Sequence, residues 1–142
     1  MGDKERGQVS ENAAAIYDKF YLPAYFEEWP PFIIKAAQIQ NGHRVVDVAC
    51  GTGVLTLAIL DKVGPKGFTV GVDNNEGMLN VAMGKTQAIA WRHAPAEALP
   101  FDDNSFDSVV SQFGLMYFED QKGALIEMMR VLQPGGNLVV AV

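Results

Sequence analysis

The sequence predicts an α/β protein built on a doubly wound, mostly parallel sheet. From Arg44 onward, short runs rich in β-branched residues alternate with amphipathic stretches, which is the pattern of parallel strands joined by helices. The first run, at residues 45–49, is almost entirely apolar, as expected of a strand buried on both faces. Because crossover connections between parallel strands are almost always right-handed, a doubly wound arrangement is favoured.

The elements after the first strand follow the same alternation. Apolar residues recur at helical spacing from Leu55 to Leu60, and Gly64-Pro65 is expected to end that helix. A second strand is predicted at residues 68–73, followed by a helix at 76–84. A weaker third strand is predicted at 87–92.

The last third of the sequence supplies two more strands and the helix between them. A turn signal at residues 102–105 leads into a fourth strand at 106–111. Helical spacing predicts a helix at 120–132, which Pro134-Gly135-Gly136 is expected to end. A fifth strand is predicted at 137–142.

Residues 1–43 differ in composition, and we expect them to form a helical cap beside the sheet domain at 44–142. Aromatic residues crowd into one stretch of this segment: Tyr17, Phe20, Tyr21, Tyr25, Phe26, Trp29 and Phe32, with prolines at positions 23, 30 and 31. One interpretation is a pair of helices whose aromatic faces pack on the sheet. The other is a lid over the carboxyl ends of the strands, and both can hold together.

Composition narrows the class of protein. The chain has 142 residues, 49% of them hydrophobic, which is typical of one compact soluble domain. A net charge of −6 argues against a nucleic-acid partner. Cys50 is the single cysteine, which excludes an internal disulfide and a cysteine-rich zinc site and favours a cytoplasmic location. No apolar run approaches the roughly 20 residues of a membrane-spanning helix.

The strongest signal of a site is the run at residues 45–53, a strand that enters a glycine-rich turn and opens a helix. Glycine at positions 51 and 53 lets the backbone approach a ligand, and the unpaired N–H groups at the helix start favour negative charge. The run departs from the dinucleotide-binding fingerprint, because Thr56 takes the place of the third glycine.

Asp73 ends the second strand, twenty residues after Gly53. A carboxylate at this place can accept hydrogen bonds from both hydroxyls of a ribose. The alternative is an ordinary acidic residue ahead of the helix that starts near Glu76. Taken with the glycine turn, Asp73 favours a nucleoside site.

Four motifs in this order resemble the class I S-adenosylmethionine-dependent methyltransferases of the ubiquinone/menaquinone-biosynthesis type. They are residues 45–53, residues 70–73 with Met78-Leu79, residues 96–101 with 105–107, and residues 130–136. The resemblance implies a Rossmann-like sheet with strand order 3-2-1-4-5, S-adenosyl-L-methionine as cofactor and S-adenosyl-L-homocysteine as product. It also implies methyl transfer to a small-molecule acceptor, with no metal.

The resemblance implies a set of cofactor-binding residues on the strand ends and the cap. The set is Tyr17, Asp47, Ala49, Gly51, Thr52, Gly53, Asp73, Asn74, Met78, Ala96, Glu97, Gln112 and Phe113. Asp47 would orient the ammonium of the cofactor, because a buried carboxylate without a cation or donor is costly. Gln112 and Phe113 would lie where cofactor and acceptor meet.

The adenine side keeps two alternatives open. Met78 either flanks the adenine or is an ordinary core methionine. Ala96 would donate its backbone N–H to the ring, but the acidic residue that often precedes this alanine is Pro95 here. Glu97 either compensates for that loss or is a solvated surface acid.

No catalytic base is implied. Methyl transfer from a sulfonium is a direct displacement, so positioning and water exclusion supply much of the acceleration. Neither His43 nor His93 is expected to act as a base, and Cys50 is interpreted as a packing residue. Aromatic residues of the cap (Tyr17, Tyr21, Tyr25 and Trp29) are candidates for a wall near the sulfonium, with Tyr17 the first choice.

Three hypotheses on function remain at this stage: a methyltransferase, a cofactor-binding or regulatory module without activity, and a nicotinamide-dependent oxidoreductase. The last is disfavoured by Thr56 and by the Pro134-Gly135-Gly136 motif. The sequence stops at Val142 inside an apolar run, whereas a complete fold of this type would add a sixth and a seventh strand. We therefore expect either a fragment of a longer protein or a homodimer that pairs through the open fifth strand.

Overall fold

The computed structural model describes residues 10–22 and 26–142. Pro23 and Tyr25 of the predicted aromatic cap, and the first nine residues of the segment assigned to it, lie outside the described residues. The elements in chain order are α1(Glu11–Ile16), η2(Tyr17–Tyr21), α3(Pro30–Ala36), β1(Arg44–Val48), α4(Val54–Val63), β2(Phe68–Asp73), α5(Glu76–Met83), β3(Ala90–His93), β4(Phe106–Gln112), η3(Leu115–Tyr117), α6(Gln121–Val131) and β5(Leu132–Ala141).

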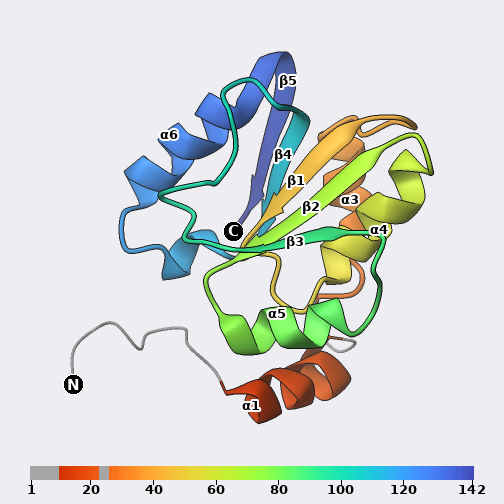
Figure 1. Ribbon diagram of the computed structural model, residues 1–142, viewed down its shortest axis with the longest axis vertical. Helices are drawn as coiled ribbons and strands as arrows, with labels where there is room; N and C mark the ends of the chain where they lie inside the picture. The colour runs from red at the N-terminus through yellow and green to blue at the C-terminus, as the bar shows by residue number, and fades with distance from the viewer. Residues whose placement is uncertain (1–9, 23–25) are drawn as a thin grey trace.

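The strands form one parallel sheet in the order β3-β2-β1-β4-β5, as Figure 1 shows. This confirms the predicted α/β fold class and strand order. The strand order reverses at β1, since the chain moves outward to β2 and β3 and then returns to β4 on the other side. Ligands of open parallel sheets bind at this kind of reversal, beyond the carboxyl ends of the strands.

Helices cover both faces of the sheet, because its central strands are apolar on both sides. Val46 and Val48 of β1 belong to a core cluster that includes Ala124 and Met128 of α6. Val45, one residue away, belongs to a second cluster with residues of α3 and α4. Side chains alternate along a strand, so this one strand contributes to both layers.

The third core cluster lies beneath α5 and explains two residues of the sequence. Cys50 is buried there with Leu79 and Trp91, which confirms its interpretation as a packing residue. Gly53 has a φ of 93°, and a Cβ on it would lie 2.9 Å from the Trp91 ring. Glycine is required at this position by both the backbone conformation and the neighbouring ring.

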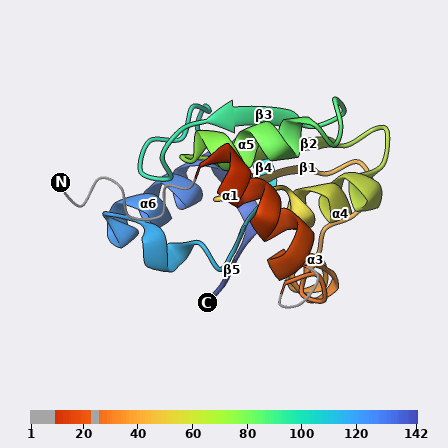
Figure 2. The same ribbon diagram turned by 90° about the horizontal axis from the view of Figure 1, so that it is seen from below.

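The N-terminal segment forms a helical cap against α5. Helix α1 lies across α5 in Figure 2, and Ser10 caps it by accepting a hydrogen bond from the Ala13 N–H at 3.2 Å. The cap then continues through the π-helical turn η2. None of the helices in the described part of the chain is long and apolar enough to cross a membrane.

One predicted boundary is wrong at the start of β5. Helix α6 ends at Val131, and Leu132 already pairs with Phe106 in the sheet, so Pro134-Gly135-Gly136 does not end the helix. The motif lies inside β5 instead, where the register shifts before Asn137 pairs with Ser108. A proline can occupy this strand because β5 lies at an edge of the described sheet and the local pairing is irregular.

The third strand also begins later than predicted, at Ala90 and not at residue 87. The Thr86 hydroxyl accepts a hydrogen bond from the Ala88 N–H at 3.1 Å, which holds these residues in a turn. The pairing of two copies through β5 stays a prediction.

Helix α6 offers a matched pair of methionines that tests the packing of the sheet. Met128 is fully buried and Met129 is 58% exposed. We expect Met128→Ala to lower the free energy of unfolding by about 2 to 4 kcal/mol, because it leaves a cavity under the sheet. Met129→Ala should change it by less than about 0.5 kcal/mol. Urea denaturation measures both, and equal losses would contradict the assigned layer.

Candidate functional site

A pocket of about 540 Å³ opens beyond the carboxyl ends of the strands. Its walls come from the segments that follow β1, β2, β3 and β4, and the cap contributes Tyr17, Leu22 and Phe26. Pockets of this volume hold ligands the size of a nucleotide. The pocket is therefore the candidate functional site, and it lies where the strand order reverses.

The structure brings all but one of the sequence-predicted site residues to this pocket. Those in its lining are Tyr17, Asp47, Ala49, Gly51, Thr52, Asp73, Asn74, Met78, Ala96, Glu97, Gln112 and Phe113. Gly53 does not belong to the lining. Its place against Trp91 shows that it shapes the turn from behind.

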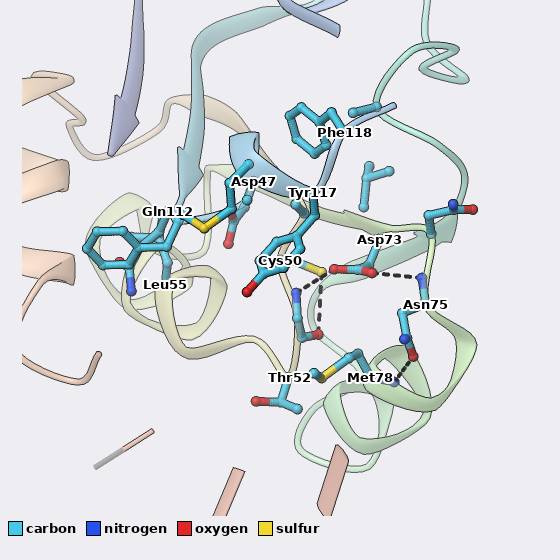
Figure 3. A pocket seen from close by; sticks show the side chains of 18 of the residues that line it. Asp47, Cys50, Thr52, Leu55, Asp73, Asn75, Met78, Gln112, Tyr117 and Phe118 are labelled. Atoms are coloured by element: carbon cyan, nitrogen blue, oxygen red, sulfur yellow. Dashed lines mark hydrogen bonds between the residues drawn. The ribbon is translucent and has the colours of Figure 1, made fainter. Parts of the chain in front are cut away.

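Asp73 joins two of the loops that form the pocket. One carboxylate oxygen accepts the Gly51 N–H at 2.8 Å, and the other accepts the Asn75 N–H at 2.7 Å. Figure 3 shows the carboxylate between these two segments. Burial raises the pKa of Asp73, and the hydrogen bonds from Gly51 and Asn75 oppose that rise. The N-cap of α5 is Asn75, which accepts from the Met78 N–H at 3.0 Å, so Asp73 is not the cap.

Asp47 is a second carboxylate of the pocket and is buried, with only 1% of its surface exposed. Its Oδ2 accepts a hydrogen bond from the Thr56 hydroxyl at 2.8 Å. Burial raises the pKa of Asp47 to about 7, the Thr56 hydrogen bond lowers it, and the charge of Asp73 raises it further. A buried carboxylate held by one hydroxyl suits a ligand that brings positive charge.

From the sequence, Thr56 was interpreted only as the residue that replaces the third glycine of the dinucleotide-binding fingerprint. It lies on the first turn of α4, fully buried, on the side of β1 where Asp47 points. A signal for this role existed in the sequence. A polar residue on the inward face of a helix is expected to have a polar partner, and Asp47 is the buried acid on the adjacent strand.

Two pocket residues other than glycine adopt a left-handed backbone conformation. Ala49, which follows β1, has a φ of 60°, and Phe113, which follows β4, has a φ of 58°. The two chain segments approach closely, because a Cβ on Gly114 would lie 2.6 Å from the Ala49 Cβ. Such conformations are costly, and they gather where the strand ends form the floor of the pocket.

The cap contributes an aromatic wall that differs from the expected one. Tyr17 lines the pocket, and burial raises the pKa of its hydroxyl to about 12. Phe26 lies next to it, with ring centres 6.0 Å apart, and also contacts Phe113 at 5.3 Å. Tyr21 and Trp29 are 54% and 45% exposed and do not line the pocket, so their expected place in the wall is wrong. They pack behind it, on Tyr17 and Phe113.

Two buried side-chain oxygens in the lining have no hydrogen-bond partner, namely Thr52 Oγ1 and Gln112 Oε1. Gln112 is the last residue of β4, whereas the predicted strand ended at residue 111 and placed Gln112 just after it. Its amide nitrogen donates to the Phe26 carbonyl at 3.3 Å, which ties the cap to the sheet. Buried polar atoms without partners are uncommon, and these two suit a polar ligand.

Glu97 has a role that neither alternative described. Its carboxylate accepts the Asp120 N–H at 3.2 Å, at the N-cap of α6, while the side chain also lines the pocket. Met78 is half-buried and lines the pocket, so it is not enclosed in the core. Ala96 is buried beside them, and Pro95 also lines this side.

A group of pocket residues after β4 was not predicted from the sequence. They are Gly114, Met116, Tyr117, Phe118 and Glu119. The run of aromatic and apolar residues at 113–118 was the available signal, and the turn η3 carries part of it. Leu22 and Phe26 of the cap were also missed, since an aromatic-rich segment does not reveal which side chains point inward.

Neither histidine belongs to the pocket lining. His43 Nδ1 accepts the Gln40 N–H at 3.2 Å, and the His93 ring lies 3.0 Å from the Asn74 carbonyl. Within residues 10–22 and 26–142, no cluster of three or more His, Cys, Asp or Glu side chains could hold a metal ion. The titratable side chains of the described lining are thus carboxylates, tyrosines and one cysteine.

Solved structures share this architecture. An S-adenosylmethionine-dependent methyltransferase from Aquifex aeolicus matches with a TM-score of 0.80 and 22% identity, over 94% of this chain and 72% of that one. At this identity the match shows the fold alone. The YcgJ protein of Bacillus subtilis matches with a TM-score of 0.70 and 30% identity, over 78% of this chain and 48% of that one. The fold is that of class I methyltransferases.

The chain belongs to the ubiE/COQ5 methyltransferase family, whose model matches residues 7–141. A demethylmenaquinone methyltransferase of Staphylococcus epidermidis is 41% identical over 137 residues, which is 92% of this chain and 57% of that protein. A protein of the same name from Staphylococcus aureus is 40% identical over 138 residues, covering 93% of this chain and 57% of the relative. The chain therefore spans little more than half the length of these relatives.

Asp47 makes the stability of the ligand-free protein depend on pH. Its pKa in the fold, about 7, lies above its usual value of 3.8, so the folded state is progressively destabilised as the pH rises between these values. We expect Asp47→Asn to gain stability over the wild type by about 2 to 3 kcal/mol between pH 5 and pH 8. Urea denaturation at both pH values tests this. A difference between variant and wild type that does not change with pH would contradict it.

Proposed function

We propose that the pocket binds S-adenosyl-L-methionine and that the chain is the cofactor-binding part of an enzyme that methylates a small molecule. The observation that carries this proposal is the pair of carboxylates, buried Asp47 and half-buried Asp73, which reach one pocket from adjacent strands. The cofactor has a ribose at one end and an amino acid at the other. Each carboxylate suits one of these ends.

The hydrogen bonds of Asp73 fit a ribose. Its oxygens accept the N–H groups of Gly51 and Asn75, and the Asn74 backbone also stabilises the charged form. A carboxylate has about four acceptor sites in total, so acceptor capacity remains for a ribose hydroxyl. Because the backbone bonds fix the carboxylate before a ligand arrives, little ordering is needed on binding.

The environment of Asp47 fits the ammonium of the cofactor. Thr56 provides one hydrogen bond, and the raised pKa shows that the burial of the negative charge is not fully compensated. An ammonium nearby would favour the ionised carboxylate and lower that pKa. The unpartnered oxygens of Thr52 and Gln112 offer further acceptors for the same polar end.

The remaining residues would hold the adenine and close the site. Met78 and Ala96 form apolar walls on the side of β2 and β3, where the adenine would lie. The bound cofactor supplies a methyl group on a positively charged sulfur. Tyr17, Phe26 and Phe113 would enclose that region, exclude water and stabilise positive charge through their rings. An acceptor that is already nucleophilic needs no base from the chain.

The acceptor side favours an aromatic small molecule. Phe113, Met116, Tyr117 and Phe118 lie after β4 and give this part of the lining an apolar, aromatic character. The relatives described above are demethylmenaquinone methyltransferases, a name that denotes a quinone-type substrate. We therefore propose a quinol or phenol as the acceptor class.

Asp73 provides the first test of cofactor binding. We expect S-adenosyl-L-methionine to raise the melting temperature of the chain, and Asp73→Ala to abolish that shift, because the ribose loses its acceptor. Asp61→Asn is the matched control, since Asp61 is an exposed acid on α4 and lies outside the pocket lining. Absence of any shift with the wild type would overturn the proposal.

A transfer assay tests the enzymatic part of the proposal. We expect methyl transfer from labelled cofactor to at least one quinol or phenol in a panel that also contains amines. Binding of the cofactor without transfer to any acceptor would instead support a binding module without activity. Calorimetry with the cofactor alone separates this outcome from a failure to bind.

A further inference from the structure

Lys85 lies just beyond the end of α5 and connects the glycine-rich turn to the cap. Its ammonium donates a hydrogen bond to the Thr52 carbonyl at 2.7 Å and pairs with the Asp18 carboxylate. The side chains of Lys85 and Asp18 are only 26% and 25% exposed. The ammonium is thus held between a backbone carbonyl and a carboxylate, away from most of the solvent.

The two partners of Lys85 belong to different segments, the glycine-rich turn and the cap. Thr52 lies in the glycine-rich turn after β1, is 1% exposed and lines the pocket. Asp18 lies in the cap, directly after Tyr17, which also lines the pocket. A single ammonium therefore holds the floor of the pocket and the aromatic cap in one arrangement.

The partial burial of the Lys85 side chain and its second partner, the Thr52 carbonyl, distinguish this contact from an ordinary surface ion pair. Exposed pairs contribute little to stability because solvent and salt screen them. Here the charge is partly shielded, and the bond to the Thr52 carbonyl fixes where the ammonium lies. The hydrogen bond from Gln112 to the Phe26 carbonyl connects the cap to the end of β4. Lys85 connects the cap to the segment that follows α5.

We propose that Lys85 is a positioning residue that couples the closed position of the cap to the conformation of the glycine-rich turn. The proposal rests on the cofactor binding proposed above. A ligand that contacts the turn then favours the closed cap, and the closed cap slows the release of the ligand, because such coupling is reciprocal. Lys85 touches neither reacting group and acts through Thr52 and Tyr17.

The test uses the full chain with S-adenosyl-L-homocysteine as the probe. We expect Lys85→Met to raise the dissociation rate constant of this probe by about fivefold or more. Asp18→Asn should raise it as well, and the double variant should be no worse than Lys85→Met, because the changes interrupt the same connection. Lys62→Met, at an exposed lysine of α4, is the matched control and should leave the rate unchanged.

A charge-exchange variant separates coupling from simple attraction. Asp18→Lys with Lys85→Asp restores opposite charges, but an aspartate cannot donate to the Thr52 carbonyl. We expect the dissociation rate to stay raised in this variant and Lys85→Arg to restore slower release. Hydrogen exchange gives a second readout: the probe should protect amides of residues 11–22 in the wild type and not in Lys85→Met.

The possible outcomes are distinct. Any of three results would overturn the role of Lys85. They are wild-type dissociation rates in both single variants, additive effects in the double variant, and full rescue by the charge exchange. Equal protection of residues 11–22 in wild type and Lys85→Met would do the same. A wild-type chain that does not bind the probe would instead overturn the proposed function.

Discussion

The pocket depends on the way in which Asp73 joins two strand ends. Its carboxylate holds the glycine-rich turn through Gly51 and the start of α5 through Asn75. Both segments would otherwise end in backbone N–H groups without partners near the surface of the pocket. Burial of the charge is unfavourable, and the two hydrogen bonds offset part of that cost. The floor of the pocket is thereby ordered in the absence of a ligand.

The same arrangement concentrates negative charge. Asp47 is buried and Asp73 is half-buried, and negative charge on one carboxylate makes ionisation of the other less favourable. The protein carries this cost in its folded state, with Thr56 as the single hydroxyl donor to Asp47. A ligand with a positive charge and hydroxyl donors relieves it, so part of the affinity would come from strain in the ligand-free site.

Local patterns were enough to predict the strands and the glycine-rich turn, because each depends on neighbouring residues. Alternation, apolar runs and turn residues act within about ten positions, whereas the strand order was implied by the resemblance to a known family. Contacts between residues that are far apart in the sequence could not be predicted in this way. Lys85 and Asp18 are 67 positions apart, and Gln112 and Phe26 are 86 apart. The start of β5 was missed for a similar reason, since its pairing with Phe106 overrides the local signal of Pro134.

The two sides of the site differ in what determines them. The residues proposed to hold the cofactor lie on strand ends, where the sheet fixes their positions through backbone pairing and hydrogen bonds. The residues proposed to enclose the sulfonium and to meet the acceptor lie in the cap and in the segment at 113–119, and there the side chains determine the shape of the walls. Substitutions in these segments can change the acceptor without disturbing the sheet. A shared fold therefore supports the cofactor more strongly than it supports any particular acceptor.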